Sequence, residues 1–104
     1  MPMRISDASM IPVHPGRILR RELKARALSA NRLALELKLP SGRITDILNG
    51  KRGISPDTAL RLGRYLGNSA RFWFNLQMAY ELAVAEREIG PRIAEEIKPA
   101  PVVA

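Results

Sequence analysis

The stretch that decides the fold reads Ser29-Ala30-Asn31-Arg32-Leu33-Ala34-Leu35-Glu36-Leu37-Lys38-Leu39-Pro40-Ser41-Gly42-Arg43-Ile44-Thr45-Asp46-Ile47-Leu48-Asn49-Gly50. Within it, apolar residues recur at helical spacing in two short segments, at Leu33, Ala34 and Leu37 and again at Ile44, Ile47 and Leu48. Ser29 is a favourable N-cap for the first segment, and Pro40 suits the start of the second. The stretch therefore predicts two short helices joined by a tight turn.

The second predicted helix has an outer face that is free to meet a partner. If its apolar positions point inward, the residues left outside are Ser41, Gly42, Arg43, Thr45 and Asp46. Two helices joined in this way form a helix-turn-helix, whose second helix enters the major groove of DNA. We expect base contacts from this face, above all from Arg43, because its planar fork matches a guanine edge. Asp46 either accepts a hydrogen bond from a cytosine amine or holds Arg43 in place.

The charge of the chain favours a polyanionic partner. Its 104 residues include 17 Lys and Arg against 10 Asp and Glu, a net charge of +7. Residues 1–64 contain 13 basic and 5 acidic side chains, whereas residues 65–104 contain 4 and 5. The positive field therefore belongs to the half that contains the predicted helix-turn-helix. Charge alone does not separate DNA from RNA or an acidic protein, and an ordinary solvated basic surface is the alternative.

Polar and basic residues beside the outer face are expected to bind phosphates. After the second helix, Gly50 and Gly53 allow a tight chain reversal with two cations between them. A generic basic surface turn is the alternative for this loop. The expected phosphate contacts are Arg32, Lys38, Asn49, Lys51 and Arg52.

The length of the chain indicates one domain. Residues 1–13 lack a periodic pattern and are expected to form a flexible arm, followed by the folded domain over residues 14–90. A Gly-Pro pair at 90–91 is expected to end the preceding helix, leaving a short helical turn and a frayed tail over residues 91–104. His14, the only histidine, is expected to cap or pack at the first helix rather than to act as a ligand or base.

The last predicted long helix, residues 70–88, has too much apolar surface for one buried face. One stripe contains Phe72 or Trp73, then Leu76, Tyr80 and Ala83, and is expected to close the core. The second stripe is expected to be covered by another copy of the chain, because so small a domain leaves it unpartnered. The alternative is that the shorter helices cover both stripes. The expected dimer interface consists of Phe74, Met78, Leu82 and Ala85.

Several segments resemble the Xre-type, Cro-like helix-turn-helix family. They are His-Pro-Gly-Arg-Ile-Leu at 14–19, Leu-Ala at 33–34 and Ile-Thr-Asp-Ile-Leu-Asn-Gly-Lys-Arg at 44–52. Ile-Ser-Pro-Asp-Thr-Ala-Leu-Arg-Leu at 54–62, followed by Phe-Trp-Phe-Asn-Leu-Gln at 72–77, resembles the HigA antitoxin branch, which is also named virulence-associated protein I. The resemblance covers about residues 11–88.

This resemblance implies an all-α, compact five-helix bundle of the lambda-repressor-like type with a long C-terminal helix. It also implies a cytoplasmic antitoxin of a type II toxin–antitoxin module that neutralises HigB, a RelE-like, ribosome-dependent mRNA endonuclease. Such an antitoxin represses its own operon as a homodimer bound to palindromic double-stranded DNA. Gly42 departs from the family pattern, because it has no side chain where relatives often have a base reader. Base reading then depends more heavily on Arg43.

Two other functions fit the sequence: a stand-alone Xre-type transcriptional regulator without a toxin, and a purely protein-binding module that buries its helix-turn-helix face. An enzyme fits least, because the chain has no catalytic set, no metal-ligand cluster and no Gly-rich phosphate loop. The absence of cysteine excludes a thiolate metal site. No apolar run approaches the roughly 20 residues that cross a bilayer. We therefore expect no cofactor, metal, small-molecule substrate or membrane partner.

Overall fold

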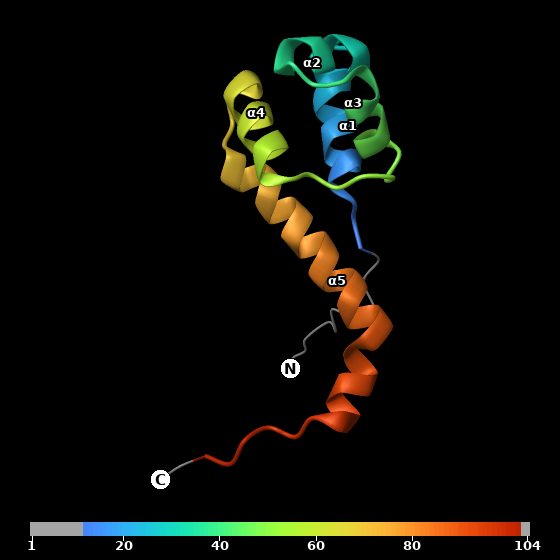
Figure 1. The fold of residues 1–104 in the computed structure, drawn as a ribbon, viewed down its shortest axis with the longest axis vertical. Coiled ribbons are helices and arrows are strands. Elements are labelled where there is room, and N and C mark those ends of the chain that lie inside the picture. Colours follow the sequence, from blue (N-terminus) through green and yellow to red (C-terminus); the bar gives the residue numbers. More distant parts are fainter. Residues whose placement is uncertain (1–11, 103–104) are drawn as a thin grey trace.

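The computed structural model describes residues 12–102, which form five helices and no strand (Figure 1). The helices are α1 (Pro15–Ala25), α2 (Ala30–Leu37), α3 (Ser41–Leu48), α4 (Pro56–Leu66) and α5 (Ala70–Glu96). The predicted all-α, five-helix fold is confirmed. The arm predicted for residues 1–13 lies almost entirely outside the described residues.

Side chains at the N-caps fix where α1, α2, α4 and α5 begin. Three of these caps are serines whose hydroxyl oxygens accept a backbone N–H: Ser29 from Arg32 at 3.0 Å, Ser55 from Thr58 at 3.2 Å, and Ser69 from Phe72 at 3.0 Å. At α1, Nδ1 of His14 accepts the N–H of Gly16 at 2.9 Å, which confirms the predicted capping role of this histidine. Each cap satisfies a backbone donor that has no partner within its helix.

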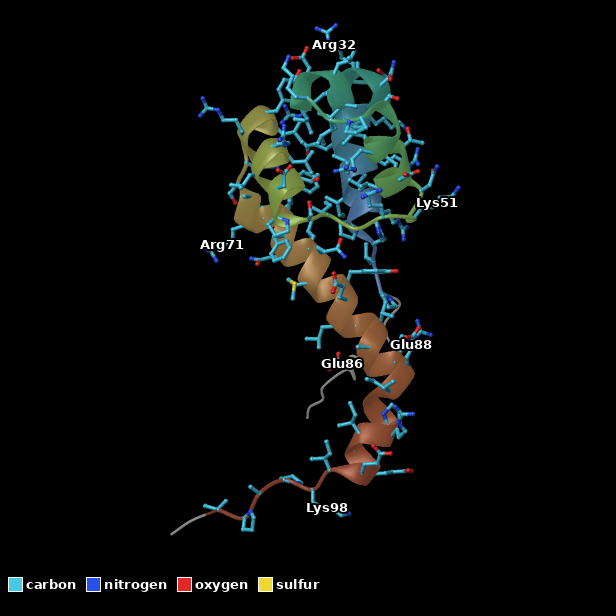
Figure 2. All side chains as sticks on the ribbon, viewed as in Figure 1. Arg32, Lys51, Arg71, Glu86, Glu88 and Lys98 are labelled. Carbon is cyan, nitrogen blue, oxygen red and sulfur yellow. The ribbon has the colours of Figure 1, made fainter. Side chains whose placement is uncertain are left out.

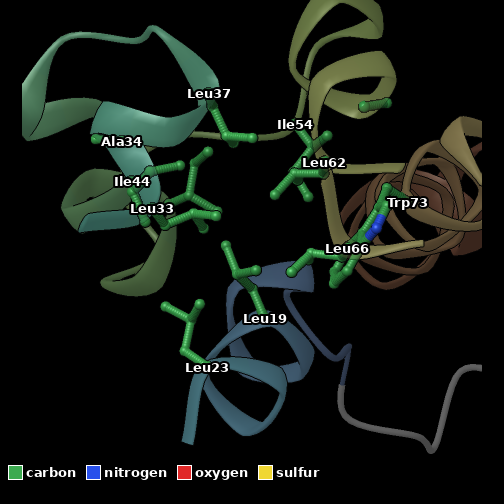
Figure 3. Packing of buried hydrophobic residues seen from close by; sticks show 12 residues of the cluster. Leu19, Leu23, Leu33, Ala34, Leu37, Ile44, Ile54, Leu62, Leu66 and Trp73 are labelled. Carbon is green, nitrogen blue, oxygen red and sulfur yellow. The ribbon is translucent and has the colours of Figure 1, made fainter. Parts of the chain in front are cut away.

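Side chains from all five helices meet in one apolar core (Figure 3). Trp73 of α5 is fully buried there, in the same cluster as Leu62 and Leu66 of α4, and its indole Nε1 donates to Oδ1 of Asn68 at 2.7 Å. Of the two aromatic residues that the sequence left open for this role, Trp73 therefore closes the core, whereas Phe72 is 42% exposed. Burying a large apolar side chain stabilises the fold by about 1.5–3 kcal/mol, so Trp73 is a main anchor of α5.

Beyond this anchor, α5 runs away from the other four helices and makes the molecule elongated, at 56 × 27 × 25 Å (Figure 1). The helix break that the sequence predicted at residues 90–91 is absent, because α5 continues through Pro91 to Glu96. A proline disfavours helix partly through a clash with the Cβ of the preceding residue, and Gly90 has no Cβ. This part of α5 is also exposed, so water can satisfy the carbonyl that loses its partner.

The N-terminus of α1 packs against the C-terminal end of α3 without room for a side chain. A Cβ built on Gly16 would overlap the carbonyl oxygen of Ile47, a rigid backbone atom. By contrast, a Cβ on Gly42, in the first turn of α3, would meet nothing within 4 Å. Gly16 therefore sets how closely α1 approaches α3, whereas Gly42 lies at an open surface.

We predict opposite effects on stability for alanine at these two glycines. Gly16→Ala should lower the free energy of unfolding by about 1–3 kcal/mol, because the methyl group forces α1 and α3 apart. Gly42→Ala should raise it by up to about 1 kcal/mol, because alanine favours helix and has open space. Urea unfolding of the two variants and the wild type measures both changes. A stable Gly16→Ala variant would contradict the close contact of α1 with α3.

Candidate nucleic-acid interface

Helices α2 and α3 form the predicted helix-turn-helix. Its turn begins at Lys38, which closes α2 in the left-handed conformation with φ 60° and ψ 42°. Pro40 then precedes α3, and its carbonyl accepts the N–H of Arg43 at 3.0 Å. The inward positions predicted from the sequence are buried except Leu48, which is half-buried; the buried ones are Leu33, Ala34 and Leu37 in α2 and Ile44 and Ile47 in α3.

The outer face of α3 is centred on Gly42 and Thr45, which are both exposed, as is Ser41 beside them. Arg43 and Asp46 are half-buried. Successive helical residues point about 100° apart, so Arg43 lies at the margin of this face rather than at its centre. Among the ion pairs within residues 12–102, there is none between Arg43 and Asp46. Of the two interpretations of Asp46, the one in which it holds Arg43 in place is therefore not realised in this structure.

The residues predicted to bind phosphates are all exposed and fall into two groups. Asn49, Lys51 and Arg52 follow the C-terminal end of α3, whereas Arg32 and Lys38 belong to the α2 side. Figure 2 shows Arg32 and Lys51 well apart on the part of the molecule that contains α1 to α4. Nε of Arg32 already donates to Oε2 of Glu36 at 2.8 Å. Its other guanidinium donors are the ones available to a ligand.

The loop that contains Lys51 and Arg52 is held from beneath by α5. The buried Gln77 accepts the N–H of Ile54 through Oε1 at 2.8 Å and donates from Nε2 to Oε2 of Glu81, also at 2.8 Å. A Cβ on Gly53 would lie 2.6 Å from Nε2 of Gln77. The glycine therefore lets the side chain of Gln77 lie close against the backbone of the loop. Gln77 therefore satisfies a backbone donor of this loop, and its own amide nitrogen is satisfied by Glu81.

His14 joins the same loop to α1 and α5. Its ring meets the ring of Tyr80 edge to face, with centroids 4.9 Å apart. Burial lowers the pKa of His14 from its ordinary value of 6.5, and a hydrogen bond with the backbone of Arg52 offsets part of that shift. A neutral imidazole keeps Nδ1 free to accept the N–H of Gly16. The cap of α1 and the position of the loop therefore depend on the same uncharged side chain.

One contact beside α3 was not predicted from the sequence. Nη2 of Arg20 in α1 lies 3.3 Å from the carbonyl oxygen of Leu48 and 3.4 Å from Oδ1 of Asn49, and it donates to both. Arg20 thereby satisfies a C-terminal carbonyl of α3 and orients the amide of Asn49. The contact joins residues 29 positions apart, so no local pattern reveals it.

The four residues predicted for the dimer interface share one face of α5. Met78 is 48% exposed and Leu82 63% exposed, while Phe74 and Ala85 are half-buried. A shallow groove is lined by Met78, Ala79, Glu81, Leu82 and Ala85. The shorter helices therefore do not cover both apolar stripes of α5, which was the alternative that the sequence allowed.

Within residues 12–102, no group of three or more His, Cys, Asp or Glu side chains is arranged to hold a metal ion. Among the helices of that range, none has the length and apolar character needed to cross a membrane.

Comparisons with known proteins agree with this architecture. Residues 19–73 match the model of the helix-turn-helix family. Virulence-associated protein I of Dichelobacter nodosus is 50% identical over 80 residues, which cover 76% of this chain and 74% of the relative. Two solved structures are each 47% identical and are matched over their full length, by 88% of this chain. They are an addiction module antidote protein of the HigA family from Coxiella burnetii, with a TM-score of 0.84, and the Pseudomonas aeruginosa antitoxin HigA with the higBA promoter, with a TM-score of 0.85.

These matches span the helix-turn-helix and most of the chain around it. The chain therefore belongs to the Xre-type helix-turn-helix family, in the branch of the HigA antitoxins and virulence-associated protein I.

Proposed function

We propose that this chain is the antitoxin of a type II toxin–antitoxin module and represses its own operon by binding operator DNA as a homodimer in the cytoplasm. The observation that carries this proposal is the open face of α3, bordered by exposed basic and polar side chains. It is supported by the HigA structure from Pseudomonas aeruginosa, which is 47% identical to this chain and is described with the higBA promoter. In this proposal the chain has no catalytic activity and uses no cofactor.

In the proposed complex, α3 lies in the major groove. Residues in the first turn of a recognition helix reach the base edges, and Arg43 is the longest of them. From the margin of the outer face, its guanidinium extends toward a guanine. Ser41 and Thr45 contact neighbouring bases or phosphates, and Asp46 accepts a hydrogen bond from a cytosine amine. Because Gly42 has no side chain, the backbone of α3 can approach the DNA closely there. The exposed cations at the two ends of α3 bind the phosphates on either side of the groove.

Arg43→Ala should weaken binding to the operator by about 1–3 kcal/mol and leave binding to a random duplex nearly unchanged, because it removes a base contact. Lys51→Ala is the matched control, since it also removes one cation but is assigned to a phosphate. It should weaken binding to both duplexes alike and flatten the dependence of affinity on salt. Competition titrations of both variants against both duplexes decide the assignment. Equal losses on the two duplexes for Arg43→Ala would refute its role in base reading.

The apolar face of α5 is the proposed dimer interface. Beyond Phe74, Met78, Leu82 and Ala85, the same face continues to Ile89 and Ile93, which are 40% and 41% exposed. An apolar stripe of this length on a helix that leaves the body is unusual for a monomer. A second copy supplies an identical stripe, so a two-fold axis across α5 buries both at once. Such a dimer presents two α3 helices to half-sites about 34 Å apart, and the operator is accordingly palindromic.

Replacing Met78 and Leu82 together by Glu should give folded monomers, because four buried carboxylates in the dimer would lack partners. Leu35→Glu serves as the control, since Leu35 of α2 is 64% exposed and lies outside the α5 face. Sedimentation velocity and circular dichroism measure the assembly and the fold. The wild type and Leu35→Glu should sediment as dimers, whereas a dimeric Met78→Glu, Leu82→Glu variant would rule out this interface.

The antitoxin role requires a partner toxin, which we propose is a HigB-type, RelE-like mRNA endonuclease encoded next to this chain. Expression of the neighbouring reading frame alone should arrest growth, and co-expression of this chain should restore it. Arg43→Ala should restore growth equally well, because toxin neutralisation does not need base reading. The two proteins should also co-purify. A neighbouring product that is harmless and does not bind would instead identify a stand-alone regulator, and failure to bind any DNA would favour a protein-binding module.

A further inference from the structure

A stripe of basic side chains on α1 is not accounted for by the interface described so far. Arg17, Arg20, Arg21 and Lys24 are all exposed, and their spacing puts them on one side of the helix. None of the four forms an ion pair with another described residue. Like charges three and four residues apart repel each other on a helix. This stripe is therefore a cost to the folded chain unless an anion lies against it.

The stripe adjoins the proposed DNA interface through Arg20. That guanidinium donates to the carbonyl of Leu48 and to Oδ1 of Asn49, at the end of α3 where Lys51 and Arg52 follow. The close contact of Gly16 with Ile47 also holds α1 against this end of α3. Arg17 precedes Arg20 along α1, and Arg21 and Lys24 follow it. The row from Arg17 to Lys24 is about 10 Å long, at the rise of 1.5 Å per residue. A row of this length spans several phosphates of duplex DNA.

We propose that Arg17, Arg21 and Lys24 bind the phosphate backbone of DNA that flanks the half-site contacted by α3. This inference rests on the proposed function and lengthens the DNA segment that the protein contacts. In it, α3 contacts the bases, the loop after α3 contacts the adjacent phosphates, and α1 contacts the DNA backbone beyond those phosphates. Because these side chains touch phosphates only, they add affinity without adding sequence preference.

The variant for the test is Arg17→Gln, Arg21→Gln. Its control is Arg64→Gln, Arg71→Gln, which removes the same charge from two exposed arginines of α4 and α5. Figure 2 shows Arg71 on the opposite side of the molecule from Lys51. All four side chains are exposed, so both variants should fold, which thermal unfolding verifies.

The probes are a duplex of about 40 base pairs from the promoter of the chain's own gene, a random duplex of the same length, and the promoter duplex trimmed to about 20 base pairs around the half-sites. Binding is measured by fluorescence anisotropy between 50 and 200 mM salt. On both long duplexes, the α1 variant should reduce the slope of log affinity against log salt by about 0.9 for each phosphate that it no longer neutralises. The preference for promoter over random DNA should not change. On the trimmed duplex, the α1 variant should bind like the wild type.

An unchanged salt slope on the long duplexes, or an equally large reduction in the control variant, overturns the inference. If Arg43→Ala still relaxes sequence preference under the same conditions, only the α1 footprint fails and the proposed function stands. If the wild type binds none of the duplexes in a salt-dependent way, the proposed function fails along with it.

Discussion

The placement of α3 depends on the contact between the backbone of Gly16 and the carbonyl of Ile47. Helix packing normally leaves room for side chains, but here the two backbones meet, so the distance between α1 and α3 is fixed by van der Waals contact. Arg20 donates across the same junction to Leu48 and Asn49, which ties the end of α3 to α1 by hydrogen bonds as well. Helix α3, which has only eight residues, is thereby held as part of the core rather than as a mobile appendage.

Helix α5 contacts the two segments that adjoin this junction, which are the loop after α3 and the N-cap of α1. Gln77 binds the backbone of Ile54, and the rings of His14 and Tyr80 meet one turn further along the helix. The buried amide of Gln77 has a partner for its oxygen, the N–H of Ile54, and a partner for its nitrogen, Oε2 of Glu81. Such satisfied buried groups favour one arrangement over others, because a shift of the loop would leave the N–H of Ile54 without a partner.

The sequence predicted the features that depend on neighbouring residues. Ser29 caps the helix that it was expected to cap, and the turn between α2 and α3 follows from the apolar spacing. Predictions failed or stayed incomplete where distant contacts or the surroundings decide. Pro91 remains inside α5 because Gly90 precedes it and the segment is exposed, which overrides the usual helix-breaking effect. The contact of Arg20 with Asn49 and the half-buried position of Arg43 depend on how α1, α2 and α3 pack, which periodicity alone does not encode.

The arrangement of α5 has a consequence for any dimer that forms through its exposed face. The same helix presents Met78 and Leu82 outward and Trp73 and Gln77 inward. Because Gln77 holds the loop after α3, and Tyr80 contacts the cap of α1, both structures that position α3 are attached to the helix that would also carry the interface. The separation of two recognition helices is then set by rigid elements rather than by a linker. Half-site spacing in DNA is a fixed length, and a rigid connection matches it at a lower entropic cost for each binding event than a flexible linker does.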